Sequence, residues 1–102
     1  MINKTPLKVP DEVIRSFCRK WQIEELALFG SILRDDLRSD SDVDVLATFA
    51  ADAKWSVFDH ARMREELSTL LGREADVVET TGLRNPFRRH EILTTRKIIY
   101  AA

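Results

Sequence analysis

Apolar residues recur along the chain at two spacings, which predict helices and strands in alternation. Residues three or four apart predict a helix that opens at Pro10, Asp11 and Glu12, with acids in its first turn. Its apolar face carries Val13, Ile14, Phe17, Cys18 and Trp21. Shorter apolar runs predict strands at residues 23–29, 43–49 and 75–78 and an edge strand at 98–100.

Two further helices are predicted between these runs. The first covers residues 54–71, where Ser56 serves as the N-cap and Gly72 ends the helix. The second covers residues 85–94 and is opened by Pro86. The remaining segments are a short helix or helical turn at residues 31–36 and a polar loop at 38–41. Strands that alternate with helices indicate an α/β or α+β sheet protein.

Composition and charge restrict the class of protein. The 102 residues fit a single domain covering residues 1–102, and a hydrophobic content of 44% is enough for a packed core. A net charge of −1 gives no bulk positive field, so neither nucleic acid nor an anionic membrane is an expected partner. We find no signal-peptide pattern and no apolar run of about 20 residues. The single Cys18 suits a reducing cytoplasm and is expected to be a buried thiol.

Two aspartates open the second predicted strand, in the sequence Asp42-Val43-Asp44. Successive side chains of a strand point to opposite faces, so Asp42 and Asp44 are expected on one face and Val43 on the other. Two carboxylates on one face repel each other unless a cation lies between them, and hard oxygen ligands suit Mg²⁺. Taken alone, an Asp-x-Asp pair is more often a solvated acidic rim.

A Gly-Ser turn, Gly30 and Ser31, ends the first predicted strand. Gly30 stands where a side chain would block a ligand, and Ser31 offers a hydroxyl and a backbone N–H at a predicted helix start, where anions bind well. Taken alone, this is an ordinary turn. Combined with Asp42 and Asp44, it places a phosphate-binding turn opposite two metal-binding carboxylates. These are the minimal groups needed to transfer a nucleotidyl group.

Asp76 opens the third apolar run and offers another carboxylate. If its strand lies beside that of Asp42 and Asp44, three carboxylates hold two metal ions, or two hold one ion while the third accepts a proton. The alternative is an ordinary aspartate at the end of a strand. Glu79 is a weaker candidate for the same role.

The chain resembles the minimal nucleotidyltransferase (MNT) family of the DNA polymerase β-like nucleotidyltransferase superfamily. The superfamily signature is Gly-Ser, a spacer, Asp-x-Asp and a third acid on a later strand. The matching residues are Gly30, Ser31, Asp42, Asp44 and Asp76, and Arg34 and Ser41 match the common form of the minimal family. Asp35 departs from that form, which usually has a small residue there, and with Asp36 it adds negative charge.

This resemblance implies a polymerase β-like fold, a small mixed β-sheet flanked by helices. It also implies an antitoxin that transfers AMP from ATP to a tyrosine of its partner, a HEPN-domain ribonuclease toxin. Asp42, Asp44 and Asp76 would hold two Mg²⁺ ions, and the backbone at Gly30 and Ser31 would hold the terminal phosphates.

Alternatives remain open for the site and for the function. Arg34 either neutralises phosphate charge or pairs with Asp35 or Asp36 on the surface. A second function class is an antitoxin that neutralises its toxin by binding alone. A third is nucleotidyl transfer to RNA or a small molecule, for which the chain has no recognisable acceptor domain. The intact Asp42 and Asp44 favour transfer to a protein.

Aromatic and basic residues outside this motif are candidates for core or interface. We expect most aromatic side chains in the core (Trp21, Phe58, Phe87, Tyr100), and Trp55 exposed against a partner. The histidines, His60 and His90, lack ligand spacing and are expected to bind no metal. A basic cluster comprises Arg84, Arg88, Arg89, His90, Arg96 and Lys97. It is a solvated helix face, a toxin-docking face or a weak nucleic-acid patch, and the lack of a stacking pattern argues against the last.

Overall fold

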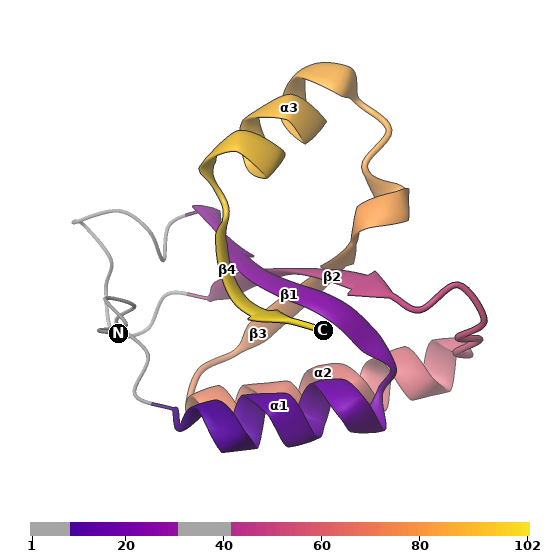
Figure 1. Cartoon of the computed structure of the whole chain (residues 1–102), viewed down its shortest axis with the longest axis vertical. Helices are drawn as coiled ribbons and strands as arrows, with labels where there is room; N and C mark the ends of the chain where they lie inside the picture. Colours follow the sequence, from indigo (N-terminus) through magenta and orange to yellow (C-terminus); the bar gives the residue numbers. More distant parts are fainter. Residues whose placement is uncertain (1–8, 31–41) are drawn as a thin grey trace.

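The computed structural model describes residues 9–30 and 42–102 (Figure 1). Its elements in chain order are α1 (Asp11–Lys20), β1 (Ile23–Phe29), β2 (Val43–Phe49), α2 (Val57–Leu71), β3 (Ala75–Glu79), the 3₁₀ helix η2 (Thr80–Gly82), α3 (Pro86–Thr95) and β4 (Lys97–Ala101). The strands predicted at residues 23–29 and 43–49 are confirmed to the residue. The short helix and polar loop predicted at residues 31–36 and 38–41 lie outside the described residues.

Four strands of the described part form one mixed sheet, in the order β3-β2-β1-β4. β1 pairs antiparallel with β2 and with β4, while β2 and β3 run parallel. The parallel pair is made possible by α2, because parallel neighbours need a long crossover between them. β4 lies at an edge, as predicted. The small mixed sheet flanked by helices is therefore confirmed.

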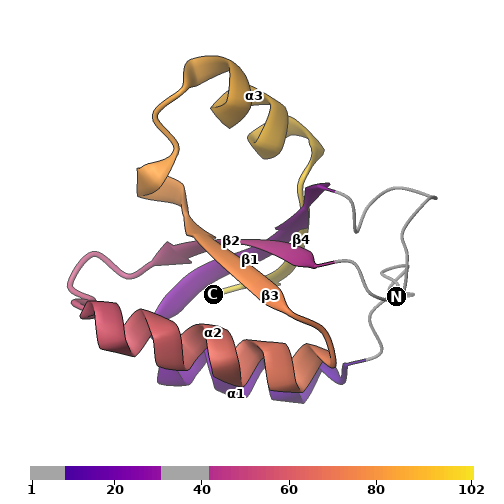
Figure 2. The same cartoon turned by 180° about the vertical axis from the view of Figure 1, so that it is seen from behind.

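Helices cover both faces of this sheet. α1 and α2 lie along one face, and α3 lies on the opposite face (Figures 1 and 2). Alternation along β2 divides its side chains between them. Val43 and Val45 pack in the larger core cluster with α1 and α2, whereas Leu46 packs in a smaller cluster with Ile92 of α3. Asp44 is two residues from Leu46 and so lies on the α3 face.

Helix ends follow signals in the sequence. The Ser56 hydroxyl accepts a hydrogen bond from the Asp59 amide (3.1 Å), and the Asp59 carboxylate accepts one from the Ser56 amide (2.9 Å). This capping box makes Val57 the first helical residue, which is why α2 starts later than residue 54. Gly72 ends α2 in the left-handed region, as predicted, and Asn85, which was expected to be the first residue of the last helix, is the N-cap of α3. None of the helices described is long and apolar enough to cross a membrane.

The expectation that most aromatic side chains are buried is wrong for Phe58 and Phe87, which are 84% and 85% exposed. The phase of each helix explains the error. Phe58 lies off the stripe of Met63 and Leu67 that packs on the sheet, and Phe87 lies off the stripe that contains Ile92. Both rings therefore stand in the first turn of a helix and face solvent.

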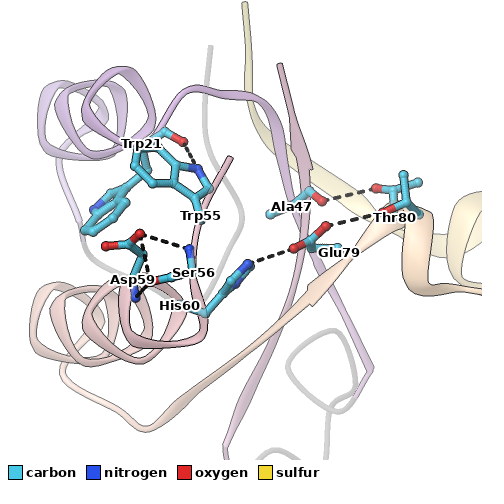
Figure 3. A network of polar contacts seen from close by, with 9 residues as sticks. Trp21, Ala47, Trp55, Ser56, Asp59, His60, Glu79 and Thr80 are labelled. Carbon is cyan, nitrogen blue, oxygen red and sulfur yellow. Dashed lines mark hydrogen bonds and ion pairs between the residues drawn. The ribbon is translucent and has the colours of Figure 1, made fainter. Parts of the chain in front are cut away.

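Trp55 is partly buried, which corrects the expectation that it is exposed. Its Nε1 donates to the Trp21 carbonyl oxygen (3.0 Å), and the two indoles meet edge to face with centroids 5.1 Å apart (Figure 3). Nearby in α2, His60 contacts Glu79 at the end of β3, with Nε2 and Oε1 2.9 Å apart. These contacts fasten the start of α2 to α1 and to the edge of the sheet.

Cys18 is fully buried in the core between α1 and the sheet, as predicted. Burial raises the pKa of its thiol to about 12. Thiolate, the reactive form, is therefore scarce at neutral pH, and Cys18 acts as a small apolar side chain.

Candidate functional site

The carboxylates singled out in the sequence gather on the α3 face of the sheet. Asp44, the second residue of β2, is aligned with Phe29 at the end of β1 and with Asp76 in β3. Asp42 lies immediately before β2 and is exposed, as is Asp76, whereas Asp44 is partly buried. The three carboxylates and Gly30 therefore occupy one end of three neighbouring strands.

Gly30 packs directly against the side chain of Asp44. Its φ of 77° lies in the left-handed region, which favours glycine. A Cβ built on Gly30 would overlap the Asp44 carboxylate, whose carbon would be only 3.3 Å away. From the sequence, this space was expected to admit a ligand, but in the structure the Asp44 carboxylate fills it. The absence of a side chain at Gly30 thus determines where the Asp44 carboxylate lies.

The charges around Asp44 act on it in opposite directions. Burial raises the pKa of its carboxyl most, and the like charges of Asp76 and Asp42 raise it further. The guanidinium of Arg88, on α3, lowers it. The like charges that raise the pKa of Asp44 in this way favour a bound cation.

Metal binding at this site depends on which ligands the protein supplies. Within residues 9–30 and 42–102, no three His, Cys, Asp or Glu side chains form a group that could hold a metal ion. Asp42, Asp44 and Asp76 thus do not close into a complete three-carboxylate site. Mg²⁺ usually takes one or two protein carboxylates and fills its shell with water and substrate phosphates. The oxygens of Asp42 and Asp44, with Gly30 packed against Asp44, fit that kind of site.

Two of the predicted nucleotide-binding residues, Ser31 and Arg34, lie outside the described residues, as does Asp35. Their roles stay predictions. Glu79, the weaker alternative to Asp76, contacts His60 on the α2 side of the sheet. It therefore takes no part in the site.

The basic residues named from the sequence do not act as one cluster. Arg96 is partly buried and pairs with Glu25, with Nε and Oε2 3.1 Å apart. Arg89 donates to the Thr80 carbonyl oxygen (3.1 Å) and so ties α3 to η2. These two arginines have structural partners and do not contribute to a free docking face.

Arg88 lowers the pKa of Asp44, an influence that sequence reasoning missed because Arg88 was counted with the other basic residues. Its influence on Asp44 follows from the position of α3 on the same face of the sheet. The signal available in the sequence is its spacing of four residues from the apolar Ile92, which places both on one side of the helix.

Comparison with known proteins shows the family and agrees with the fold. The model of the nucleotidyltransferase domain family matches residues 10–99. The protein adenylyltransferase MntA of Thermococcus cleftensis is 28% identical over 81 residues, which cover 79% of this chain and 77% of that protein. A solved structure assigned as a minimal nucleotidyltransferase is 34% identical, with a TM-score of 0.68, and the match covers 84% of this chain and 85% of that chain.

One solved complex extends the likeness at lower identity. It contains a tri-AMPylated Shewanella oneidensis HEPN toxin with an MNT antitoxin, and one of its chains matches with a TM-score of 0.62. The match covers 90% of this chain and 70% of that chain at 19% identity. At this identity the likeness is one of fold, and it agrees with the mixed sheet and helices described above.

Proposed function

The chain belongs to the nucleotidyltransferase domain family, and on that premise we propose that it is a Mg²⁺-dependent protein adenylyltransferase. Its nucleotide is ATP, and its acceptor is a tyrosine of a HEPN-domain toxin that this chain silences as the antitoxin. Similarity to the adenylyltransferase MntA and a fold shared with an MNT antitoxin complex support the proposal. The observation that carries it is the alignment of Asp44 with Asp76, beside Gly30, on one face of the sheet.

Each carboxylate has a defined task in this proposal. Asp42 and Asp44 hold Mg²⁺, which when bound neutralises phosphate charge and favours ionisation of the attacking hydroxyl. Asp76, on the neighbouring strand, ligates a second ion or accepts the tyrosine proton. The tyrosine oxygen forms a bond to the α-phosphorus of ATP, the bond from that phosphorus to the pyrophosphate oxygen breaks, and pyrophosphate leaves.

The turn after β1 supplies the nucleotide-binding groups. Backbone N–H groups at Gly30 and Ser31 hold the terminal phosphates, because unpaired amides at such a turn bind anions. Arg34 neutralises charge as pyrophosphate departs.

Radiolabelled ATP, Mg²⁺ and the HEPN protein encoded by the neighbouring gene provide the direct test. We expect the HEPN protein to become labelled and EDTA to abolish the labelling. Asp42→Asn and Asp44→Asn should each reduce the rate more than about 100-fold, since losing even the outer partners of metal ligands costs 10–100-fold. Asp52→Asn is the matched control, because Asp52 is an exposed aspartate in a turn after β2.

The outcomes separate the function classes. Full labelling by both Asp42→Asn and Asp44→Asn would show that the metal assignment is wrong. If both variants lose labelling but still bind the toxin and protect cells, neutralisation occurs by binding alone. Labelling of RNA in place of the HEPN protein would identify a different acceptor.

A further inference from the structure

The strand that carries Asp76, β3, forms one edge of the sheet (Figure 2). In a strand, the amide and carbonyl of each residue point to the same side, and this side alternates from one residue to the next. The Val43 amide donates to the Glu74 carbonyl oxygen (2.9 Å), so the even-numbered residues here turn their backbone groups toward β2. The odd-numbered residues of β3 turn theirs away from the sheet: Ala75, Val77 and Glu79.

Some of these outward groups already have partners. The Ala75 amide donates to the Ser68 hydroxyl (2.8 Å), and the Ala75 carbonyl oxygen accepts from Arg64 Nε (3.0 Å). The Glu79 carbonyl is that of the N-cap residue of η2 and faces the first turn of this helix. Within residues 9–30 and 42–102, the amide and carbonyl of Val77 and the amide of Glu79 have no hydrogen-bond partner. These three groups form an open stretch of strand edge, which is a template for another strand.

A hollow of about 650 Å³ lies beside the start of this edge, along the outer side of α2. Ala61, Arg64, Ser68 and Glu74 are among the residues that line it, and two of them are the side chains bonded to Ala75. A segment added to β3 would direct alternate side chains toward α2. The hollow gives those side chains room.

The remaining side chains of an added segment would lie on the α3 face, beside Asp76. Asp76 is aligned with Asp44 on β2, and neighbouring strands are about 4.8 Å apart. A side chain on the added strand therefore has only β3 to cross before it reaches Asp44. A tyrosine suits this span, because its hydroxyl is at the far end of a long, rigid ring. The carboxylates make this face negative, so the residues next to the tyrosine should be neutral or basic.

We propose that the acceptor tyrosine reaches the site on an extended segment of the partner protein, which adds to β3 as a further strand. This inference rests on the proposed function and names how its acceptor is bound. Main-chain hydrogen bonds to Val77 and Glu79 hold the segment, and the alternation of side chains directs the tyrosine to the face of Asp76. A tyrosine in the middle of a helix is therefore not an acceptor.

Amide hydrogen exchange of the wild-type protein, followed by NMR, tests this mode of binding. In the free protein, the amides of Val77 and Glu79 should exchange much faster than those of Asp76 and Val78, which are bonded to β2. Adding the HEPN protein encoded by the neighbouring gene, without ATP, should slow exchange at Val77 and Glu79 by at least about 10-fold, the effect of a hydrogen bond worth about 1.4 kcal/mol. Unchanged exchange at both amides in the complex would overturn the proposal.

Glu79→Pro blocks the same edge without removing a hydrogen bond of the sheet. Glu79 has a φ of −79°, which a proline ring accepts, and its amide points outward. Glu79→Ala is the matched control, since it loses the same carboxylate and its contact with His60 but keeps the amide. The KM for the HEPN protein should be about 10-fold higher for Glu79→Pro than for Glu79→Ala. The dissociation constant for MgATP should be the same for both variants.

The results distinguish this inference from the function on which it rests. If the wild-type protein does not label the HEPN protein, the proposed function fails, and this inference fails with it. If the wild-type protein does label it and the two Glu79 variants share one KM, only the docking edge is wrong. A weaker affinity of Glu79→Pro for MgATP would show that the substitution disturbs the nucleotide site, and the unchanged edge of the wild-type protein then decides through hydrogen exchange.

Discussion

Replacing Gly30 by alanine tests whether the backbone there positions the Asp44 carboxylate. The left-handed φ of 77° costs an alanine about 1–2 kcal/mol, while the stiffer unfolded chain returns about 0.4–1 kcal/mol. The new Cβ also overlaps the carboxylate, and forcing Asp44 off its rotamer costs about 0.5–1.5 kcal/mol. We therefore expect Gly30→Ala to lower the free energy of unfolding by about 1–2 kcal/mol.

Gly72→Ala is the matched control, because it has the same backbone strain without the overlap. Gly72 has a φ of 70°, and a Cβ built on it meets no atom within 4 Å. Its cost is the backbone contribution alone, about 1 kcal/mol or less, which lowers Tm by up to about 4–8 °C. Gly72→Ala should label the toxin at the wild-type rate below its Tm. Gly30→Ala should be slower by about 100-fold, the effect of displacing a reacting group by about 1 Å.

Thermal denaturation and labelling are measured side by side on both variants. The difference between the two labelling rates is the decisive quantity, since it removes the contribution of backbone strain. If Gly30→Ala labels the toxin as fast as Gly72→Ala, the Asp44 carboxylate does not depend on the missing side chain, and the reasoning is refuted.

Further predictions concern stability and reactivity. In EDTA, Asp44→Asn should be more stable than wild type at neutral pH and lose this advantage on acidification. Burial and neighbouring carboxylates raise the folded-state pKa of Asp44, so its ionised form costs stability as pH rises above about 4. Equal melting curves for Asp44→Asn and wild type at pH 7 would contradict this. Trp55→Phe should lower the free energy of unfolding by about 1 kcal/mol in urea, since it loses the hydrogen bond to Trp21, and no change would mean that this bond is not formed in solution. Phe58→Ser should change the free energy of unfolding by no more than about 0.5 kcal/mol, because the ring is exposed. A larger loss of stability would show that the ring is packed. Cys18 should resist a thiol reagent at pH 8 until urea unfolds the chain, so rapid native labelling would disprove its burial.

The strands could be read from the sequence because their local signals agree with the fold. The apolar run before Gly30 ends at Phe29, where β1 ends, and the period of two correctly placed Asp44 opposite the buried Val43 and Val45. The parallel pairing that aligns Asp44 with Asp76 was only conditional in the sequence argument, since strand order is decided by packing between distant segments.

Helix phase and helix position were harder to predict. Phe58 and Phe87 were expected in the core because they are aromatic, but each lies on the solvent-facing side of its helix. Arg88 looked like one of several surface arginines until α3 was seen on the face that bears Asp44. Glu79, which the sequence ranked below Asp76, contacts His60 because its position in the strand turns it toward α2.

The alternation along β2 makes this strand unusually sensitive to changes in length. Adding or removing one residue inside β2 would rotate every later side chain to the opposite face. Insertion just ahead of Asp44 would therefore turn its carboxylate toward α1 and α2 and expel Val45 from the larger core. The turn at Ala51 and Asp52, outside the ladder and exposed, carries no such constraint. Among related sequences, length differences are thus expected in that turn and not within the strand, so the same seven residues preserve stability and chemistry together.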